Sequence, residues 1–337
     1  CLDLIRKIKM EVTNKKIKTI GVMTSGGDAP GMNPFIRSVV RACSAYGIRA
    51  LGIEEGYEGL IHGKFREMGA RDVSGILQRG GAILQTARSK EFREASGQRE
   101  AVRQINNVEM DALIVAGGDG SLNGAQKLVA KGVPVVGVPA SIDNDIYGTD
   151  MCIGVDTALN TIVDAIDKIR DTASSHNRAF LVETMGRESG YLAVQAGIVT
   201  GAEMVLIPEH KTPPQEVAAA IEEAYRRGKS HAIIVVAEGY QPRTPVLGAM
   251  TDAIDIGFTP RVTILGHIQR GGKPSAFDRL LAQRFGVAAV EFLMEGKSNV
   301  MTALVGSEIQ AVPIEEVVNH RKVLSDKFIE MTRILAK

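Results

Sequence analysis

The sequence is short of cysteine, aromatic residues and net charge, and each shortage excludes a class of protein. Its 337 residues include three cysteines, at positions 1, 43 and 152, which fit neither a disulfide framework nor a zinc-binding pattern. Aromatic residues make up 4% of the chain and the formal net charge is +1. A near-neutral chain is no general polyanion binder. Its RGG triplets, at residues 79–81 and 270–272, lack the interleaved aromatic residues of single-strand binders, so we expect no nucleic-acid partner.

Long apolar segments are also absent. No apolar run approaches the roughly 20 residues that span a bilayer. The first twelve residues have neither the continuous apolar core nor the small-residue cleavage site of a secretory signal. Leu2, Ile5, Ile8 and Val12 instead follow a helical period, which predicts a short amphipathic helix. We therefore expect a cytoplasmic protein with no membrane partner.

Apolar strand-like runs alternate with helix-like stretches along most of the chain. The strand-like runs are residues 18–23, 49–54, 112–116, 134–139, 179–184, 203–208, 232–239, 261–266 and 300–306. Because these runs are mainly apolar and alternate with helix-like stretches, they indicate parallel strands covered by helices on both faces of a sheet. The number of runs exceeds one sheet of usual size. We predict an α/β protein with two doubly wound domains, mainly parallel sheets and an active site in the cleft between the domains.

Glycine-rich segments follow two of the strand-like runs, at the place where doubly wound folds bind ligands. Gly26-Gly27-Asp28 and the segment 117–121 (GGDGS) each lie between an expected strand and an expected helix. Glycines let backbone amides approach phosphate oxygens, and a helix N-terminus adds a favourable field. Neither segment is a Walker loop, since no GK[ST] follows. The alternative is a tight strand-to-helix turn without a ligand, but two such segments, each with an acid, favour phosphate binding.

Carboxylates gather near the same strand ends. Asp119 and Asp145 follow two successive strands and are suited to hold Mg²⁺. Asp143 and Asp145 are two residues apart, so in an extended segment they project to one side. Two close carboxylates need different roles, such as metal binding for one and proton acceptance for the other. The alternative for each acid alone is a turn or a helix cap.

Basic residues recur beside glycines and strand boundaries. They are Arg88, Arg178, Arg187, Arg261, His267 and Arg270. Any one of these arginines is as well suited to a surface ion pair of little energetic value. Their repeated placement indicates phosphate recognition, because guanidinium groups bind phosphate in a two-pronged geometry.

The motifs together resemble those of the bacterial ATP-dependent 6-phosphofructokinases. The resemblance starts near Ile17, covers nearly the whole remaining chain, and rests on GGDAPGMN, GGDGS, IDND, MGR and GHIQRGG in this order. GGDG alone also occurs in NAD, diacylglycerol and sphingosine kinases. The resemblance implies phosphoryl transfer from MgATP to the 1-hydroxyl of fructose 6-phosphate in glycolysis. It also implies an allosteric homotetramer, so ATP, fructose 6-phosphate and further copies of the chain are the expected partners and Mg²⁺ the expected cofactor.

The domain division follows from the same resemblance. An N-terminal extension covers residues 1–16. The larger, ATP-binding domain covers 17–154 plus about 267–316, and the smaller, sugar-phosphate-binding domain covers 155–266 plus about 317–337.

The resemblance also implies roles for individual residues. Asp143 takes the hydroxyl proton, Asp119 and Asp145 are metal-side carboxylates, Arg187 steadies the base and the substrate, and Arg88 reaches the transferring group; Ser141 joins them as a catalytic residue. The implied ATP contacts are Gly27, Arg88, Ser89, Gly118, Asp119, Gly120 and Ser121. The implied sugar-phosphate contacts are Ser141, Ile142, Asp143, Arg178, Met185, Gly186, Arg187, Glu238, Arg261, His267 and Arg270, with Arg178 and Arg261 serving a neighbouring subunit.

A second, effector-binding site is implied as well. Arg37 and Arg41 are spaced i,i+4 on one expected helix face and match two effector-site arginines of the family. The remaining matches are Arg170, Gly201, Glu203, Arg227, Lys229 and His231. ADP or phosphoenolpyruvate is the expected effector. One effector-site arginine of the family falls on Ala70 here.

The sequence departs from the family in a few places. The usual PGTIDND is PASIDND here, so Ser141 keeps a hydroxyl and Ala140 stays small. The segment 238–248 (EGYQPRTPVLG) differs from common members.

Two alternative functions remain. A pyrophosphate-dependent phosphofructokinase typically has Asp at Gly120 and Lys at Ala140, so the small residues favour ATP. A non-catalytic regulatory subunit is disfavoured because Asp119, Asp143 and Arg187 are retained.

Overall fold

The computed structural model describes residues 17–254 and 257–336, and these divide into two compact units. The first unit contains residues 17–141 with Ile146–Gly154 and Lys273–Arg321, and the second contains Ile142–Asp145, Val155–Gly272 and the chain from Lys322 onward. The helix expected between Leu2 and Val12 lies outside the described residues. The structure shares the boundary after Gly154 with the expected division.

The structural division differs from the expected one in three segments. Residues 317–321 were expected in the smaller domain but group with the first unit. Ile142–Asp145 and the residues 267–272 group with the second unit, although both were expected in the larger domain. Side-chain contacts account for this, because Asp143 pairs with Arg187 and Gln269 bonds to Met185, both within the second unit.

The first unit is a seven-stranded sheet covered by helices. Its strand order is β11-β10-β5-β4-β1-β2-β3, with parallel pairing from β10 to β2 and antiparallel pairing of β3 and β11 at the two edges. The elements are β1 (Thr19–Thr24), α1 (Met32–Ala45), β2 (Arg49–Ile53), α2 (Gly56–Ile61), β3 (Phe65–Met68), η2 (Glu91–Arg93), α3 (Ala95–Asn107), β4 (Ala112–Gly117), α4 (Asp119–Val129), β5 (Val135–Pro139), α9 (Ala276–Met294), β10 (Val300–Val305), β11 (Glu308–Pro313) and α10 (Ile314–Asn319).

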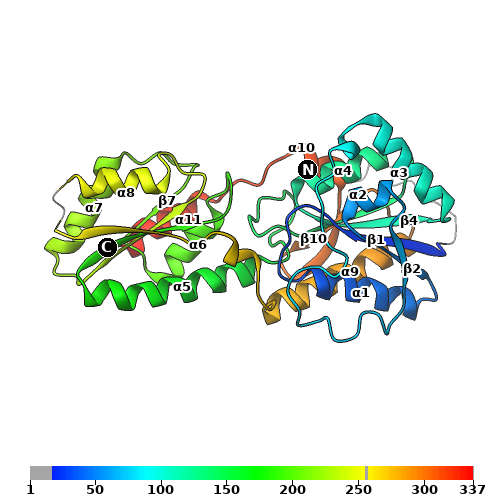
Figure 1. Cartoon of the computed structure of the whole chain (residues 1–337), viewed down its shortest axis with the longest axis horizontal. Coiled ribbons are helices and arrows are strands. Elements are labelled where there is room, and N and C mark those ends of the chain that lie inside the picture. The colour runs from blue at the N-terminus through cyan, green and yellow to red at the C-terminus, as the bar shows by residue number, and fades with distance from the viewer. Residues whose placement is uncertain (1–16, 255–256, 337) are drawn as a thin grey trace. The chain divides into compact units, whose positions relative to one another are not determined.

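The second unit is a four-stranded, all-parallel sheet in the order β7-β8-β6-β9. Its elements are α5 (Val155–Ser175), β6 (Arg178–Thr184), α6 (Tyr191–Thr200), β7 (Met204–Leu206), α7 (Pro214–Arg226), β8 (Ala232–Ala237), α8 (Thr244–Asp252), β9 (Thr259–Ile264), η3 (Gly266–Arg270) and α11 (Asp326–Leu335). Helices α5 and α6 pack against each other, as do α7 and α8, and α11 contacts α6 (Figure 1).

Burial explains why these segments form parallel strands. Every residue of β1, β4, β5 and β8 is buried, as expected when helices cover both faces of a sheet. Figure 1 shows α1 and α9 on one face of the first sheet and α2, α3 and α4 on the other. The predicted α/β class with mainly parallel sheets is confirmed. In the part of the chain that the structure describes, no helix combines the length and apolar character needed to cross a membrane.

Each sheet has a point where the strand order reverses. In the first sheet, β1 pairs with β2 on one side and with β4 on the other. In the second, β6 lies between β8 and β9. Ligands in such folds bind beyond the carboxyl ends of strands at these reversal points. Ligand-binding residues are therefore expected in the loops after β1, β4, β6, β8 and β9.

Candidate active site

The two glycine-rich loops of the first unit pack against each other. They follow the neighbouring strands β1 and β4, and the Ser25 amide donates to the Ala116 carbonyl at 2.9 Å. A Cβ on Gly117 would lie 2.5 Å from the Ser25 carbonyl oxygen and 2.4 Å from Ser121 Oγ, so no side chain fits there. Gly27 lies half-buried in the first loop. Glycine at position 117 is thus required by the close approach of the two loops.

The GGDGS segment opens α4 as expected. Gly118 is the N-cap and Asp119 lies in the first turn, where its carboxylate accepts from Asn123 Nδ2 at 3.0 Å. Gly120 faces open space, since a Cβ there would meet nothing within 4 Å. Ser121 is buried. The free amide groups and the dipole of an eleven-residue helix make this end suited to phosphate.

A chain of contacts connects the loop that carries Arg88 and Ser89 to the N-terminal end of α4. Ser89 Oγ accepts from the Phe92 amide at 3.0 Å, and the Phe92 ring stacks on Tyr57 with a centroid separation of 4.0 Å. The Tyr57 hydroxyl then donates to the Ser121 carbonyl at 2.6 Å. Arg88 is exposed beside this chain of contacts. The predicted nucleotide residues of the first unit therefore lie on loops that support one another.

Ser141 joins these loops from the carboxyl end of β5. The Ala140 amide donates to the Gly117 carbonyl at 3.0 Å. A Cβ on Gly118 would lie 3.7 Å from Ser141 Cβ. Ser141 is half-buried, and Ile142 directly after it is fully buried. The short side chains at 140 and 141 thus lie directly beside the start of α4.

Asp143 is a buried carboxylate in the second unit. Its exposed fraction is 3%, its Oδ2 lies 3.5 Å from Arg187 Nε, and its Oδ1 has no hydrogen-bond partner among the described residues. Burial, together with the charges of Asp145 and Glu238, raises the pKa of Asp143 to about 6, against the opposing effect of Arg270 and Arg187. A carboxylate with this pKa is mostly ionised at neutral pH and is a better proton acceptor than an ordinary aspartate.

The Asp143–Asp145 segment does not have the extended geometry on which we based their orientation. Ile142 and Asp143 form a turn, and Asn144 between the two acids has a φ of 49°, in the left-handed region. The extended interpretation was therefore wrong. The two carboxylates are nevertheless close enough for Asp145 to raise the pKa of Asp143. Asp145 is partly exposed and belongs to the second unit, whereas Asp119, the other expected metal ligand, belongs to the first.

The turn after β6 carries Met185, Gly186 and Arg187. Glu238 Oε1, at the end of β8, accepts from the amides of Gly186 and Arg187 at 3.2 and 2.7 Å. Glu238 was expected to contact the sugar, and the structure adds that one of its oxygens holds the backbone of this turn. The side chain of Arg187 is 60% exposed, and its Nε points to Asp143.

The segment 266–270 forms η3 after β9 and carries His267 and Arg270. The charge of Arg270 lowers the pKa of Asp143, so the two side chains are near each other. Gln269, which the sequence argument passed over, is fully buried and accepts from the Met185 amide at 3.1 Å. The sequence offered one signal for Gln269, namely its position between His267 and Arg270 in the GHIQRGG motif.

Arg178 and Arg261 lie away from this group. Arg178 begins β6, six residues before Thr184, and at about 3.3 Å per residue this places it roughly 20 Å from the end that carries Met185. Arg261 pairs in register with Phe180, and its Nη1 donates to the Pro260 carbonyl at 3.1 Å. Within one chain the structure does not bring Arg178 to Asp143 and Arg187.

Most of the expected effector residues of the second unit form a separate charged cluster. Lys229 Nζ lies 3.1 Å from Glu203 Oε1, and Arg170 donates to the Thr200 carbonyl beside Gly201. Burial first, and then the charges of Arg170 and Lys229, lower the pKa of His231, against the opposing effect of Glu203. Arg227 instead pairs with Glu223 one turn earlier on α7. Arg37 and Arg41 lie on α1 in the first unit, where Arg37 Nη1 donates to Gln283 Oε1 at 3.2 Å.

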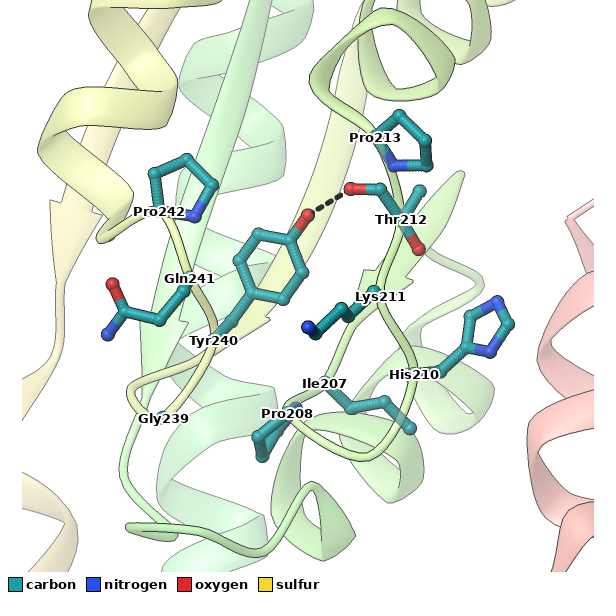
Figure 2. Close-up of a pocket in the computed structure, with 10 residues that line it drawn as sticks. All are labelled: Ile207, Pro208, His210, Lys211, Thr212, Pro213, Gly239, Tyr240, Gln241 and Pro242. Atoms are coloured by element: carbon teal, nitrogen blue, oxygen red, sulfur yellow. Dashed lines mark hydrogen bonds between the residues drawn. The ribbon is translucent and has the colours of Figure 1, made fainter.

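A pocket of about 590 Å³ opens at the carboxyl ends of β7 and β8, and no predicted site residue lines it. Its walls are Ile207, Pro208, His210, Lys211, Thr212, Pro213, Gly239, Tyr240, Gln241 and Pro242. Figure 2 shows the Tyr240 hydroxyl bonded to the Thr212 carbonyl and His210 directed away from Tyr240. The segment 239–242, which departs from the family pattern, thus forms one wall next to Glu238.

Comparisons of the sequence with known proteins identify a family of matching proteins. A sequence model of the family described as Phosphofructokinase matches residues 19–293. The chain is 50% identical over 321 residues to the ATP-dependent 6-phosphofructokinase of Thermotoga neapolitana, covering 95% of this chain and 100% of that one. It is 48% identical over 323 residues to the ATP-dependent 6-phosphofructokinase 1 of Thermus thermophilus, with the same coverage.

Solved structures show the same fold. The phosphofructokinase of Saccharomyces cerevisiae matches with a TM-score of 0.83 and 37% identity over 90% of this chain, which spans 45% of that longer chain. A pyrophosphate-dependent phosphofructokinase from Marinobacter aquaeolei matches with a TM-score of 0.81 and 22% identity, covering 92% of this chain and 86% of that one. At 22% identity, the match to the pyrophosphate-dependent enzyme shows a shared fold alone.

Proposed function

Because the chain belongs to the phosphofructokinase family, we propose that it transfers the γ-phosphoryl group of ATP to the 1-hydroxyl of fructose 6-phosphate, giving fructose 1,6-bisphosphate and ADP. The observation that carries this proposal is the Asp143 carboxylate, which is buried and has a pKa raised to about 6, and whose Oδ1 has no hydrogen-bond partner in the described part of the chain. A base of this kind suits the removal of a proton from a hydroxyl group during transfer.

On the acceptor side, the 1-hydroxyl proton passes to Asp143 as the oxygen attacks phosphorus. Arg187, with its Nε 3.5 Å from Asp143 Oδ2, orients the base and balances its charge. The sugar phosphate is bound by Met185, Gly186, Glu238, His267 and Arg270, together with Ser141 and Ile142. Phosphoryl transfer depends mainly on positioning and charge stabilisation, so this set of contacts supplies most of the catalysis.

On the donor side, the start of α4 binds the phosphates of ATP. The amides of Gly118 and Gly120 face the anion, and Gly27 lets the neighbouring loop approach it. Ser121 completes this end of the helix, where its amide donates to the Gly118 carbonyl at 2.9 Å. Arg88 stabilises the transferring group, and Ser89 fixes the loop through its bond with Phe92.

Asp119 and Asp145 are the residues we propose to hold Mg²⁺. The donor set fits, because both offer hard carboxylate oxygens and Asp145 raises the pKa of Asp143 through a repulsion that a bound cation would offset. When bound, the ion neutralises charge on the phosphate oxygens of the nucleotide.

ATP is favoured over pyrophosphate by the two small residues beside α4. A Cβ at Gly120 meets nothing within 4 Å, so the space there is open. Ala140 is buried against the Gly117 loop and brings no positive charge to it. A non-catalytic subunit is disfavoured because the buried Asp143 and its partner Arg187 have no evident structural benefit.

The donor is tested by incubating the purified chain with fructose 6-phosphate, Mg²⁺ and either ATP or pyrophosphate, and measuring the bisphosphate by an aldolase-coupled assay. We expect product with ATP and none above background with pyrophosphate. Product from pyrophosphate alone would replace the proposal with the pyrophosphate-dependent reaction. No product from either donor would favour the regulatory subunit.

We also propose assembly and regulation. Arg178 lies roughly 20 Å along β6 from the acceptor residues, which supports a role for Arg178 and Arg261 in a neighbouring copy of a homotetramer. The cluster of Arg170, Glu203, Lys229 and His231 offers positive charge for an anionic effector, ADP or phosphoenolpyruvate. Gly201, Arg227, Arg37 and Arg41 complete the proposed effector residues. The proposed location is the cytoplasm, where both substrates are found.

A further inference from the structure

The turn after β6 has a backbone conformation that its surroundings must maintain. Arg187 has a φ of 53°, a left-handed value that residues with side chains rarely adopt. Gly186 has a φ of 142°, and a Cβ on it would lie 2.3 Å from the Ser189 carbonyl oxygen. Such strain costs free energy and persists only where neighbouring groups hold it. Two side chains from other strand ends are placed to do so.

Glu238 and Gln269 accept the three successive amide protons of this turn. Glu238 Oε1 accepts from Gly186 and Arg187, and Gln269 Oε1 accepts from Met185 at 3.1 Å. Gln269 also donates from Nε2 to the Gly266 carbonyl at 2.9 Å. Its side chain has an exposed fraction of 0%. One buried amide group therefore bonds to the turn after β6 and to the turn after β9.

The two turns that Gln269 joins carry the charged groups of the acceptor side. The turn after β6 carries Arg187, which reaches Asp143, and the turn after β9 carries His267 and Arg270. A leucine or methionine would fill the same volume, but neither could bond both backbones. A buried amide is retained without cost only when its donor and acceptor are both satisfied, as they are here.

We propose that Gln269 is a positioning residue for the sugar-phosphate side of the reaction, holding the turn after β6 at a fixed distance from the turn after β9. It touches no substrate and acts through Arg187, His267 and Arg270. The inference rests on the proposed function, because it assigns those three residues to the substrate. A shift of about 1 Å in such groups is enough to cost roughly 100-fold in rate.

The kinetic test compares Gln269→Met with a matched control, Thr251→Val. Thr251 is a fully buried residue of the same unit whose hydroxyl bonds to the Leu247 and Gly248 carbonyls within α8, away from the site. We expect Gln269→Met to lower kcat about tenfold and to raise KM for fructose 6-phosphate about tenfold, while KM for ATP stays within about twofold. Thr251→Val should leave all three values within about twofold.

The outcomes separate positioning from packing. A folded Gln269→Met enzyme with kcat and KM for fructose 6-phosphate within twofold of the parent would overturn the proposal. Equal losses in both variants would also overturn it, because they would show a general effect of lost stability. A rise in KM for ATP as large as the rise for the sugar phosphate would also overturn it, since among the described residues the side chain of Gln269 bonds within the second unit alone.

Amide hydrogen exchange on the parent chain provides a test that needs no variant. We expect the Met185 amide to exchange at least about 100-fold more slowly than exposed loop amides, because its partner is fully buried. Exchange at the rate of an exposed loop would overturn the proposal even if Gln269→Met fails to fold. If the parent chain phosphorylates nothing, the proposed function fails, while the exchange rate still reports whether Gln269 holds the turn.

Discussion

Replacing Asp143 by asparagine should abolish turnover and, at the same time, stabilise the fold. The change keeps the shape of the side chain and removes its charge and its basicity. Loss of a general base typically lowers the rate by about 10²–10⁴-fold. Substrate binding should change little, because the contact between Asp143 and Arg187 is 3.5 Å long and the arginine is 60% exposed, and such pairs contribute little.

The gain in stability follows from the burial of the charge. The pKa of Asp143 rises from 3.8 to about 6 on folding, with burial as the main cause. At 1.36 kcal/mol per pKa unit, keeping this group ionised above pH 6 costs the folded state up to roughly 3 kcal/mol. Asparagine removes that cost. The unpartnered position of Oδ1 stays unpartnered in both proteins, so its contribution roughly cancels.

The sign of the pH dependence is fixed by the raised pKa. Because the folded state binds the proton more tightly, the protonated Asp143 favours folding below pH 4, and this benefit is lost as the pH rises through about 6. The asparagine variant should therefore match the parent near pH 4 and exceed it above pH 6. A gain of 2–3 kcal/mol raises Tm by roughly 4–10 °C in a domain of this size.

The assay pairs steady-state kinetics with thermal melts recorded at several pH values without Mg²⁺. Asp164→Asn is the matched control, since Asp164 is an exposed residue of α5 that pairs with Lys168; it should leave kcat and Tm nearly unchanged. A kcat for Asp143→Asn within tenfold of the parent would refute the assignment of the base. A lower Tm than the parent at pH 8 would refute the argument from charge burial.

Three further predictions concern other parts of the chain. Gly120→Asp should fold normally, since a Cβ at this position meets nothing within 4 Å, but it should raise KM for ATP at least tenfold, because the carboxylate repels phosphate. Gly120→Ala is the control. An unchanged KM for ATP in Gly120→Asp would contradict the placement of the nucleotide. Mixing inactive Asp143→Asn and Arg261→Ala chains, with subunit exchange verified by mass, should restore activity; verified hybrids without activity would show that Arg261 does not serve a neighbour. Tyr240→Phe removes the donor to the Thr212 carbonyl and should lower the free energy of unfolding by about 1 kcal/mol in urea melts without changing kcat; an unchanged unfolding curve would show that this bond contributes nothing.

Local sequence was sufficient to predict the strands that lie inside the sheets. The segments 112–116 and 134–139 are apolar throughout, and β4 and β5 cover nearly the same residues. The two edge strands of the first sheet, β3 and β11, were missed for a physical reason. β3 is four residues long and has two exposed positions, and β11 has no fully buried residue. Such strands depend on the neighbour with which they pair more than on their own sequence, so no local pattern marks them.

The donor side was also easier to predict than the acceptor side. The GGDGS loop owes its conformation to glycines, and glycine is visible in the sequence. The turn after β6 is held by Gln269, 84 residues away from Met185, and the left-handed conformation of Arg187 has no mark of its own in the sequence. Contacts of this length are set by the tertiary fold, which explains why Gln269 was overlooked inside a motif that had been noticed.

Three unfavourable features concentrate on the acceptor side of the second unit. Asp143 is ionised and buried, Asn144 is left-handed, and Arg187 is left-handed with its charge directed toward the buried acid. Each of these features lowers the stability of the fold, and none is needed to form the four-stranded sheet. Residues that oppose folding are retained where they perform chemistry. Left-handed side-chain residues also occur in the first unit, at Glu55 and Gln85, so backbone strain alone does not single out the acceptor side. The feature that supports the proposal of proton transfer there is the buried carboxylate of Asp143 with its raised pKa.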